Sequence, residues 1–445
     1  MFKKKIKNYI DYNKKHIIDK INKNTNDKYD ILLNELRELN SKANKINNTL
    51  EYLKQSEQFP KYDSLMYKKK EGKKKILVCG FYGAFNLGDE LMAHALLSKI
   101  DMNKYDVTVM ISNNEHFDPT KYKKVNFIYF PRYFYEFSLI SSFFDAIIWG
   151  GGALIDDDGY DNREYISIGM TLNKLTASFI NQGKPVYLYG LSSTGKFTKK
   201  EFLKDFNYLA KKATYFSLRD TNSKEVLEEN GIDVKKVKIV HDLVFTYDEL
   251  RYEKKKQSDE NYIKVGVDLI LNEQSMKNNK IIISKLINYL DNLNKNYVIN
   301  LIPYYTYQDN DFRYLQSLKD ELDNKNIKIY PYSYNIEEIT NIIDENDYFV
   351  CSRYHMSLLT NALNKQVLFI NYDIHRHYNV KNKYLYNKYG FNKNYINFSE
   401  LKNIDTALEK LFNTEPVKFN LEIVEEANKE LNEMLKLVDC SLNKK

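Results

Sequence analysis

The stretch that decides the fold reads Tyr348-Phe349-Val350-Cys351-Ser352-Arg353-Tyr354-His355. Its first four residues are largely apolar and predict a buried strand, and residues 356–363 predict a helix after it. A second apolar strand, residues 366–373, follows almost at once. This order is typical of a parallel α/β sheet, in which ligands bind outside the carboxyl ends of the strands. We therefore expect Arg353 and His355 to lie at a ligand site, with both side chains on one side of the strand end.

The Arg353–His355 pair combines a permanent cation with a side chain that exchanges protons near neutral pH. Such a pair suits an anionic substrate that needs a proton moved. A lone histidine is more often a structural group. Here the neighbouring arginine, the strand end and the start of a helix favour a functional interpretation.

Strands and helices alternate on both sides of this segment. One βα series occupies residues 73–249 and a second occupies residues 262–412, while the charged residues 250–261 between them predict a linker. Residues 413–445 predict a last helix or tail. The predicted class is α/β, with two Rossmann-like domains and a cleft between them.

The composition indicates a globular protein, because 43% of the 445 residues are hydrophobic and glycine and proline are few. The formal net charge is +7, but residues 1–23 alone hold eight lysines against two aspartates, a net charge of +6. The rest of the chain is close to neutral, so we expect no nucleic-acid partner.

The N-terminal 60 residues predict a basic helical tail followed by a coiled-coil stalk. Apolar residues recur at alternating spacings of three and four over residues 29–53, a little over three heptads. This pattern favours a homo-oligomer, and a single helix packed along its own domain is the alternative. The basic residues 1–24 could contact the anionic inner face of a membrane, or simply be solvated.

The cysteines and the apolar runs bear on the compartment. Cys79 and Cys351 fall in apolar strands far from each other and from Cys440, so we expect buried thiols in a reducing compartment. No apolar run reaches the ~18 residues of a membrane span. Charges interrupt the apolar residues of the N-terminus, unlike those of a signal peptide. We expect a cytoplasmic protein, with at most a peripheral membrane contact.

A glycine-rich turn, residues 80–90, follows the first strand and reads Gly-Phe-Tyr-Gly-Ala-Phe-Asn-Leu-Gly-Asp-Glu. Gly83, Asn86 and Asp89 could bind a substrate there, because backbone N–H groups and the helix N-terminus attract anions. The spacing matches neither a dinucleotide-binding fingerprint nor a phosphate-binding Walker loop. An ordinary turn, with Asp89 capping the helix, is an equal alternative.

A second glycine cluster, residues 150–152, ends the strand predicted at residues 146–149. Gly151 and Gly152 would let a ligand approach the backbone closely. Asp156, Asp157 and Asp158 lie just beyond, where their carboxylates could bind sugar hydroxyls or a metal, although adjacent aspartates more often form a solvated turn. No histidine or glutamate nearby supplies a further ligand, so we expect no metal site.

Two further strands end in charged residues. Arg219 could clamp a phosphate or carboxylate with its planar fork. The alternative is an ion pair with Asp220, or a capping role for that aspartate. His241 and Asp242 are adjacent and cannot face each other on a strand, so we expect one of them to be structural.

Taken in order, these segments resemble the polysaccharide pyruvyl transferase family. The resemblance covers roughly residues 74–380, and no single motif would carry it alone. The motifs are Gly80–Glu90, Trp149–Asp156, Gly183–Gly190, Leu218–Ser223, His241–Phe245, Ser352–His355 and Asn371–Asp373.

The resemblance implies a GT-B-like fold and transfer of pyruvate from phosphoenolpyruvate to two sugar hydroxyls of a cell-surface glycan precursor. The product is a cyclic ketal, and phosphate is released. By resemblance, Arg353 and Arg219 would hold the donor and His355 would be the acid–base group. The first domain would face the acceptor and the second the donor, and no metal or nucleotide cofactor is implied.

Two positions after the last strand also belong to the implied substrate site. They are Tyr372 and His375, the second standing where many family members carry a lysine. The middle residue of the Arg-x-His motif is Tyr354, where leucine is frequent in the family. A glycosyltransferase that uses a nucleotide sugar is the alternative function, because fold alone does not fix function. A non-catalytic scaffold is a third, which the intact Arg353–His355 pair disfavours.

Overall fold

The computed structural model describes most of the chain from Gly72 onward, and this part forms one unit. The predicted tail and coiled coil, His375 and residues 252–261 of the predicted linker lie outside the described residues. The described residues are 72–111, 125–131, 134–160, 167–193, 195, 197–251, 262–306, 310–333, 335–373, 388–389 and 394–443.

The first lobe is built on a parallel sheet of seven strands in the order β3-β2-β1-β4-β5-β6-β7. The order reverses beside β1, which creates the switch point where such sheets bind ligands. The strands are β1 (Lys74–Cys79), β2 (Tyr105–Ile111), β3 (Asn126–Tyr129), β4 (Ala146–Ile155), β5 (Val186–Ser193), β6 (Tyr215–Leu218) and β7 (Lys238–Ile239).

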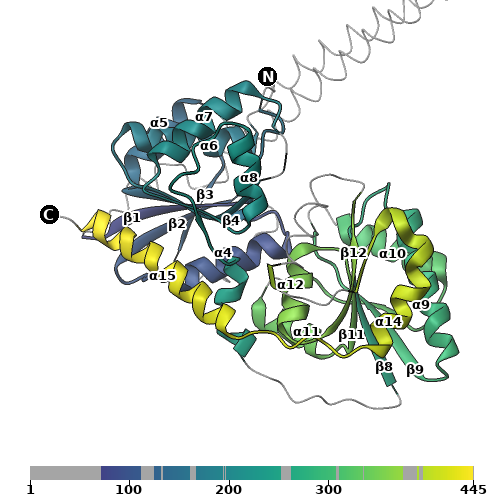
Figure 1. The fold of residues 1–445 in the computed structure, drawn as a ribbon. Coiled ribbons are helices and arrows are strands. Elements are labelled where there is room, and N and C mark those ends of the chain that lie inside the picture. The colour runs from purple at the N-terminus through teal and green to yellow at the C-terminus, as the bar shows by residue number, and fades with distance from the viewer. Residues whose placement is uncertain are drawn as a thin grey trace, which may run out of the picture. The chain divides into compact units, whose positions relative to one another are not determined.

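Helices connect these strands and cover both faces of the sheet (Figure 1). They are α4 (Leu87–Lys99), α5 (Phe134–Phe143), α6 (Ile168–Asn181), α7 (Lys200–Lys212) and α8 (Thr221–Glu229). Two short 3₁₀ helices, η2 (Leu243–Thr246) and η3 (Asp248–Arg251), follow β7. Leu250 is buried in η3, so the first two residues of the predicted linker belong to the first lobe instead.

The second lobe is built on a parallel sheet of six strands in the order β10-β9-β8-β11-β12-β13. Its strands are β8 (Tyr262–Asp268), β9 (Asn296–Leu301), β10 (Ile327–Ile329), β11 (Tyr348–Cys351), β12 (Gln366–Asn371) and β13 (Tyr395–Asn397). Its helices are α9 (Met276–Asn292), α10 (Asn310–Leu322), α11 (Ile336–Asp344), α12 (Tyr354–Ala362), η5 (Phe398–Asn403) and α14 (Ile404–Asn413).

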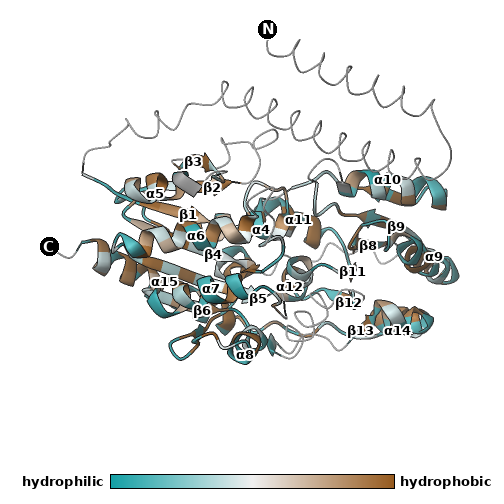
Figure 2. Ribbon diagram, turned by 90° about the horizontal axis from the view of Figure 1, so that it is seen from above, coloured by the Kyte–Doolittle hydropathy of each residue, from teal (hydrophilic) through white to brown (hydrophobic). Residues whose placement is uncertain are grey.

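The last helix, α15 (Glu422–Leu442), returns to the first lobe and lies on the same side of its sheet as α4 (Figure 1). Hydrophobic and hydrophilic residues alternate along it (Figure 2). Its apolar side is buried at Val424, Leu431 and Val438. Its polar side reaches the segment after β7, where Glu430 accepts a hydrogen bond from the backbone N–H of His241 at 2.7 Å. The chain therefore crosses between the lobes twice.

One continuous apolar core spans both lobes. It joins α4, α15 and one face of the first sheet to α11, α12 and the facing side of the second sheet. A second core fills the other side of the second sheet, under α9 and α14. The prediction of two parallel α/β sheets is confirmed. Among the described residues no helix is both long and apolar enough to span a membrane.

Two expectations about local structure were wrong. The cluster of residues 150–152 is part of β4, which continues to Ile155 through an irregular register, because Gly151 and Gly152 adopt positive φ angles that keep the strand paired. Arg353 and His355 do not extend β11, which ends at Cys351; they begin α12. The structure also contains elements that were not predicted, namely β3, α5, α7, β13 and α14.

Cys79 and Cys351 are fully buried in β1 and β11, as predicted. Burial raises the pKa of both thiols well above the usual range. A thiol held in its protonated form is a poor nucleophile and a poor metal ligand.

Candidate active site

Strand ends from both sheets meet in one buried cluster of polar side chains. Arg219 follows β6 and His355 lies in the first turn of α12, and Nη1 of Arg219 lies 3.2 Å from Nε2 of His355. The two residues are 136 positions apart in sequence. The rule that ligands bind at strand ends predicted both of them, and the structure brings them into contact.

Arg219 is held by side chains of both lobes. It is only 4% exposed, and its Nη1 donates to Oδ2 of Asp242 at 2.7 Å. Its Nη2 donates to Oγ of Ser192 at 3.0 Å. The guanidinium carbon lies 4.4 Å from the ring centre of Tyr354, a cation–π distance. The adjacent Asp220 caps α8 instead, where it accepts from the backbone of Ser223.

Asp242 is the counter-ion of the cluster. It is fully buried, which by itself favours the neutral acid, but Arg219 and His355 lower the pKa of its carboxyl below the usual range. Its neighbour His241 points to α15, with Nδ1 3.1 Å from Glu430. The two adjacent residues therefore face different partners, Asp242 in the cluster and His241 on the last helix.

His355 has a partner at each ring nitrogen. Nδ1 lies 3.2 Å from the hydroxyl of Tyr304, and Nε2 lies near both Arg219 and Oδ2 of Asp242, the latter at 3.5 Å. A neutral ring can accept from Arg219 at Nε2, because a guanidinium only donates. A protonated ring can turn its Nε2–H to Asp242. The site therefore accommodates both forms of the imidazole, as an acid–base group requires.

Gly88, in the first turn of α4, lets the two lobes approach each other at His355. A Cβ atom at this position would clash with Nδ1 of His355 and with the hydroxyl of Tyr304. Next to it, the N–H of Leu87 donates to the carbonyl of Tyr304 at 2.9 Å. The N–H of Thr306 likewise donates to a carbonyl of the glycine-rich turn at 3.1 Å. Sequence reasoning did not single out this glycine for that role.

Other residues of the glycine-rich turn shape the turn itself. The N–H of Gly83 donates to Oε1 of Glu90 at 2.7 Å. Asn86, and not Asp89, caps α4, accepting from the N–H of Gly88 at 3.2 Å. These contacts agree with the ordinary-turn alternative for Gly83 and Asn86. Asp89 lies beside the glycine strand, since a Cβ at Gly152 would be 3.2 Å from its Oδ1.

Glycines of β4 leave space for α4 and the cluster. A Cβ at Gly151 would lie 2.9 Å from Sδ of Met92, and that sulfur lies 3.9 Å from Nη1 of Arg219. The glycines thus let β4, α4 and Arg219 lie close together. The side chain of Met92 lies between the two glycines, Gly151 and Gly152, and Arg219 of the cluster.

Asp156 belongs to a run of three aspartates whose carboxylate oxygens lie within 4.8 Å of one another. Its own Oδ1 accepts the N–H of Asp158 at 2.9 Å. The middle residue, Asp157, accepts the N–H groups of Thr198 and Lys199 at 2.6 and 2.8 Å, at the start of α7. These bonds, which all end on Oδ2, anchor the loop at the start of α7.

Arg353 lies on the second-lobe side of the cluster and is paired. Its Nη2 donates to both oxygens of Asp311 at 2.9 and 3.1 Å, and its Nε donates to the carbonyl of Leu269 at 3.3 Å. Its guanidinium carbon lies 4.9 Å from the ring centre of Tyr304. Tyr304 therefore lies between Arg353 and His355, so the two predicted residues do share one site.

Besides Asp311, the ionisable residues Asp268 and Lys388 lie near the cluster and were not predicted. Asp268, the last residue of β8, is fully buried, and its Oδ1 lies 3.8 Å from Nε of Arg353. The sequence signal that could have identified Asp268 was an acidic residue at the end of an apolar strand of the second sheet. Lys388 donates from Nζ to the carbonyls of Arg219 at 3.2 Å and Val240 at 3.0 Å, and burial lowers its pKa. No sequence pattern marked this lysine.

Tyr372 lies apart from the cluster. It is buried in the core of the second lobe, where its hydroxyl donates to Asn272 at 3.3 Å and its ring packs on Phe398 at 4.7 Å. Nothing in these contacts links it to Arg219 or His355, so its substrate role stays a prediction.

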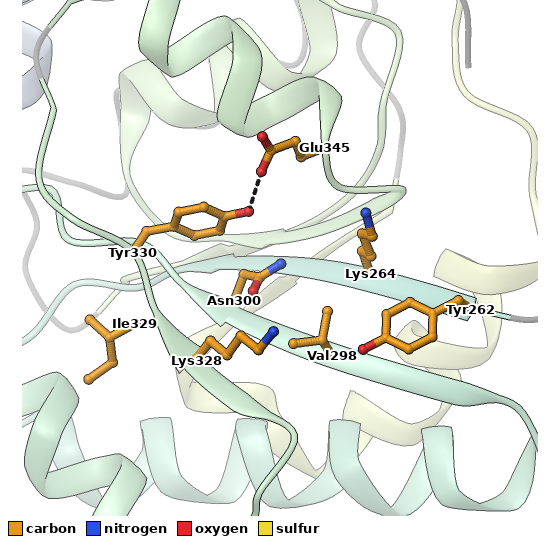
Figure 3. A pocket seen from close by; sticks show the side chains of 8 residues that line it. All are labelled: Tyr262, Lys264, Val298, Asn300, Lys328, Ile329, Tyr330 and Glu345. Carbon is orange, nitrogen blue, oxygen red and sulfur yellow. Dashed lines mark hydrogen bonds between the residues drawn. The ribbon is translucent and has the colours of Figure 1, made fainter. Parts of the chain in front are cut away.

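A cavity of about 470 Å³ lies on the second sheet, away from the cluster (Figure 3). Its polar lining groups come from β8, β9, β10 and the end of α11, and none belongs to the cluster. The lining residues are Tyr262, Lys264, Val298, Asn300, Lys328, Ile329, Tyr330 and Glu345.

Solved structures with similar folds support the arrangement of the two lobes. HepE of Anabaena, in complex with UDP and glucose, is 13% identical, with a TM-score of 0.52 over 83% of this chain and 97% of that one. UDP-GlcNAc 2-epimerase of Neisseria meningitidis, bound to UDP-GlcNAc, is 13% identical, with a TM-score of 0.52 over 82% and 99%. UDP-GlcNAc 2-epimerase of Methanocaldococcus jannaschii, in complex with UDP-GlcNAc and UDP, is 12% identical, with a TM-score of 0.51 over 82% and 99%. These likenesses show that the fold is GT-B-like.

Sequence comparison gives the family. No protein of curated function matches the chain. The sequence profile of polysaccharide pyruvyl transferases matches residues 86–374, well over half of the chain and the whole of the cluster from Gly88 to His355. The chain belongs to the polysaccharide pyruvyl transferase family.

Proposed function

We propose that this protein transfers pyruvate from phosphoenolpyruvate to two hydroxyls of a sugar in a cell-surface polysaccharide or glycolipid precursor. The observation that carries the proposal is the contact of Arg219 with His355 across the two lobes. This contact supports the proposal, because it joins a permanently charged guanidinium to an imidazole at the strand ends of a GT-B-like fold.

The proposed reaction moves two protons. A proton adds to the methylene carbon C3 of the donor while one acceptor oxygen bonds to C2. The second acceptor oxygen then displaces inorganic phosphate from C2, which completes the cyclic ketal. The two hydroxyl hydrogens end on C3 and on phosphate. His355 suits these proton transfers, because its Nε2 has an acceptor, Asp242, and a donor, Arg219, within 3.5 Å.

Arg219 and Arg353 would hold the phosphate and carboxylate of the donor in this scheme. Each already has a buried carboxylate partner, Asp242 and Asp311 respectively. These partners fix the two guanidinium planes, so less conformational entropy is lost when the donor binds. Tyr304, between Arg353 and His355, would position the imidazole through its hydroxyl. The reaction as written uses no metal or nucleotide cofactor.

The acceptor sugar would approach from the first lobe. Asp89 lies beside Gly152 of β4, and its carboxylate could accept hydrogen bonds from sugar hydroxyls. Asp156, at the loop anchor after β4, is a second candidate for that role. We also propose that His375, which lies outside the described residues, helps to bind the donor.

Binding at a membrane and self-association are separate proposals for the N-terminal 60 residues. The eight lysines of residues 1–23 would attract the anionic cytoplasmic face of a membrane, where lipid-linked acceptors could be met. The heptads of residues 29–53 would join copies of the chain. Both proposals can be tested with the protein without residues 1–60. Unchanged co-sedimentation with vesicles would contradict the membrane contact. An unchanged oligomeric mass in light scattering would contradict the self-association.

Phosphate release from phosphoenolpyruvate, measured against a panel of sugar acceptors, tests the main proposal. We expect release with wild type, and a loss of at least ~100-fold with His355→Gln. His241→Gln is the matched control, because that histidine contacts α15 and not the cluster. Full activity of His355→Gln would refute the mechanism.

A nucleotide-sugar glycosyltransferase is the second candidate, because the similar folds include proteins solved with UDP or UDP-GlcNAc. The same acceptor panel, supplied with UDP-sugars, distinguishes the two. Release of UDP without any release of phosphate from phosphoenolpyruvate would favour the glycosyltransferase.

A further inference from the structure

A buried carboxyl group, that of Asp268, lies beside the proposed donor site. Asp268 ends β8, opposite Cys351 of β11 in the register of the sheet. Its side chain is fully buried, and neither oxygen has a hydrogen-bond partner among the described residues. Buried carboxylates normally accept several hydrogen bonds, because an ionised group without partners is costly away from water. A group in this position calls for a functional explanation.

The nearest cation, Arg353, already has a carboxylate partner. Asp311 accepts two hydrogen bonds from Nη2 of Arg353, and its Oδ2 also accepts the backbone N–H groups of Tyr304 and Tyr305 at 2.8 and 2.7 Å. Asp311 therefore already uses Arg353 and two backbone N–H groups as hydrogen-bond donors. One guanidinium lies between two buried carboxyl groups, that of Asp311 and that of Asp268, whose Oδ1 is 3.8 Å from its Nε. If both carboxyl groups were ionised, this end of the cluster would carry a net negative charge.

Titratable groups from four elements face Asp268. They are Arg353 at the start of α12, Asp311 of α10, Tyr304 after β9 and Cys351 of β11. Burial, opposed by Arg353 and assisted by Asp311, raises the pKa of Asp268 to about 8. Burial also raises the pKa of Tyr304 and of Cys351, so both stay neutral in neutral and mildly alkaline solution. Geometry and charge both indicate that Asp268 carries a proton at neutral pH.

We propose that Asp268 is a specificity-determining residue of the donor site. As a neutral carboxyl it leaves the Arg353–Asp311 pair without excess negative charge, so that a phosphorylated, polyanionic donor can bind beside it. Loss of its proton makes this end of the cluster negative and repels the donor. The proposal rests on the proposed function, because it concerns the affinity for phosphoenolpyruvate.

The proposal predicts that donor affinity falls in alkaline solution. If the donor binds only the protonated form, its Kd rises about tenfold one pH unit above the pKa of Asp268. The phosphate of the donor does not produce this change, because the second ionisation of a phosphate monoester is complete near pH 7. His355 and Lys388 could also titrate. The comparison therefore requires a variant that removes the ionisation of Asp268 alone.

Calorimetric titration of phosphoenolpyruvate into the full-length protein from pH 6.5 to 9.5 tests the proposal. Asp268→Asn is the informative variant, since an amide resembles the protonated acid in shape and cannot ionise. Asp405→Asn is the matched control, because Asp405 is an exposed partner of Lys285 on α9. We expect Kd to rise at least fivefold between pH 7 and 9 for wild type and control, and to change less than twofold for Asp268→Asn.

The outcomes separate this inference from the proposed function. A wild-type Kd that is constant from pH 7 to 9.5 overturns the inference without use of a variant. An equal alkaline rise in wild type and Asp268→Asn overturns it too, since another group then titrates. Donor binding in either case leaves the proposed function standing. A complete lack of donor binding by wild type at every pH refutes the proposed function, and the inference with it.

Discussion

Replacing Asp268 by asparagine should also change how the stability of the protein depends on pH. The native state holds a proton on this carboxyl up to a pKa of about 8, whereas the unfolded chain releases it near the ordinary value of 3.8. Between these values the native state binds one proton more than the unfolded state. Stability therefore falls by about 1.4 kcal/mol for each pH unit of increase. Asparagine removes this dependence.

The magnitude follows from the same pKa. From pH 6 to pH 8 the free energy of unfolding of Asp268→Asn should gain about 2 kcal/mol on that of wild type, since the slope flattens as pH approaches 8. Globular proteins unfold with an entropy of about 2.1 cal/mol/K per residue, so roughly 370 residues give about 0.8 kcal/mol/K. The difference in Tm between the two proteins should widen by about 3 °C over this range.

Thermal unfolding followed by circular dichroism at pH 6, 7 and 8 measures this difference. Asp405→Asn controls for the general effect of removing a carboxylate, and its Tm should stay parallel to that of wild type. A constant difference in Tm between Asp268→Asn and wild type at all three pH values would contradict the reasoning. It would mean that Asp268 is ionised in the native state and that Arg353 compensates its burial fully.

Three further changes test other parts of the structure. Gly88→Ala places a methyl group against His355, and a displacement of that ring by ~1 Å should reduce the rate of phosphate release about 100-fold with little change in the circular dichroism spectrum; wild-type activity would contradict the close packing. Asp242→Asn leaves a buried guanidinium without its counter-ion, and should lower the free energy of unfolding by about 3–5 kcal/mol in denaturant titration. Glu430→Ala, which removes the acceptor of the backbone N–H of His241 after β7, should lower the free energy of unfolding by about 1–3 kcal/mol. The exposed Glu433→Ala on the same helix should cost less than about 0.5 kcal/mol, and equal costs would show that α15 is not anchored at Glu430.

The architecture could be predicted because parallel sheets are covered on both faces. Strands of such sheets are continuous apolar runs, as in residues 146–149 and 367–370, and helices separate them at short intervals. The prediction was weaker at the sheet edges. There β3 has only one buried residue among its four, so little apolar pattern marks it.

The glycine cluster after residue 149 shows a limit of local rules. Three glycines usually indicate a loop, because their backbone conformations are unrestricted. In β4 the same freedom lets the strand continue with positive φ at Gly151 and Gly152, packed against Met92 of α4. Only the neighbouring helix decides between the two outcomes, and its position is a tertiary property.

The site was predicted in part, because the strand-end rule selects residues by their place in the fold. Arg219 and His355 satisfied the rule and are in contact. Gly88 and Tyr304 could not be found in this way, because their role depends on the approach of the two lobes. A glycine in the first turn of a helix and a tyrosine after a strand are ordinary in sequence.

The charges of the site are the least predictable feature. In the sequence, Arg219 and Arg353 suggest two unpaired cations that could bind an anion. In the structure, each is paired with a buried aspartate from another segment of the chain. With both pairs neutral, the affinity for an anionic donor depends on the groups whose charge can change. Among these groups are His355 and Asp268, and they act in the same direction, since protonation of either one favours the anion. Donor binding at such a site would depend on two protons. One is the proton of His355, which the reaction uses, and the other is the proton of Asp268 at the end of β8.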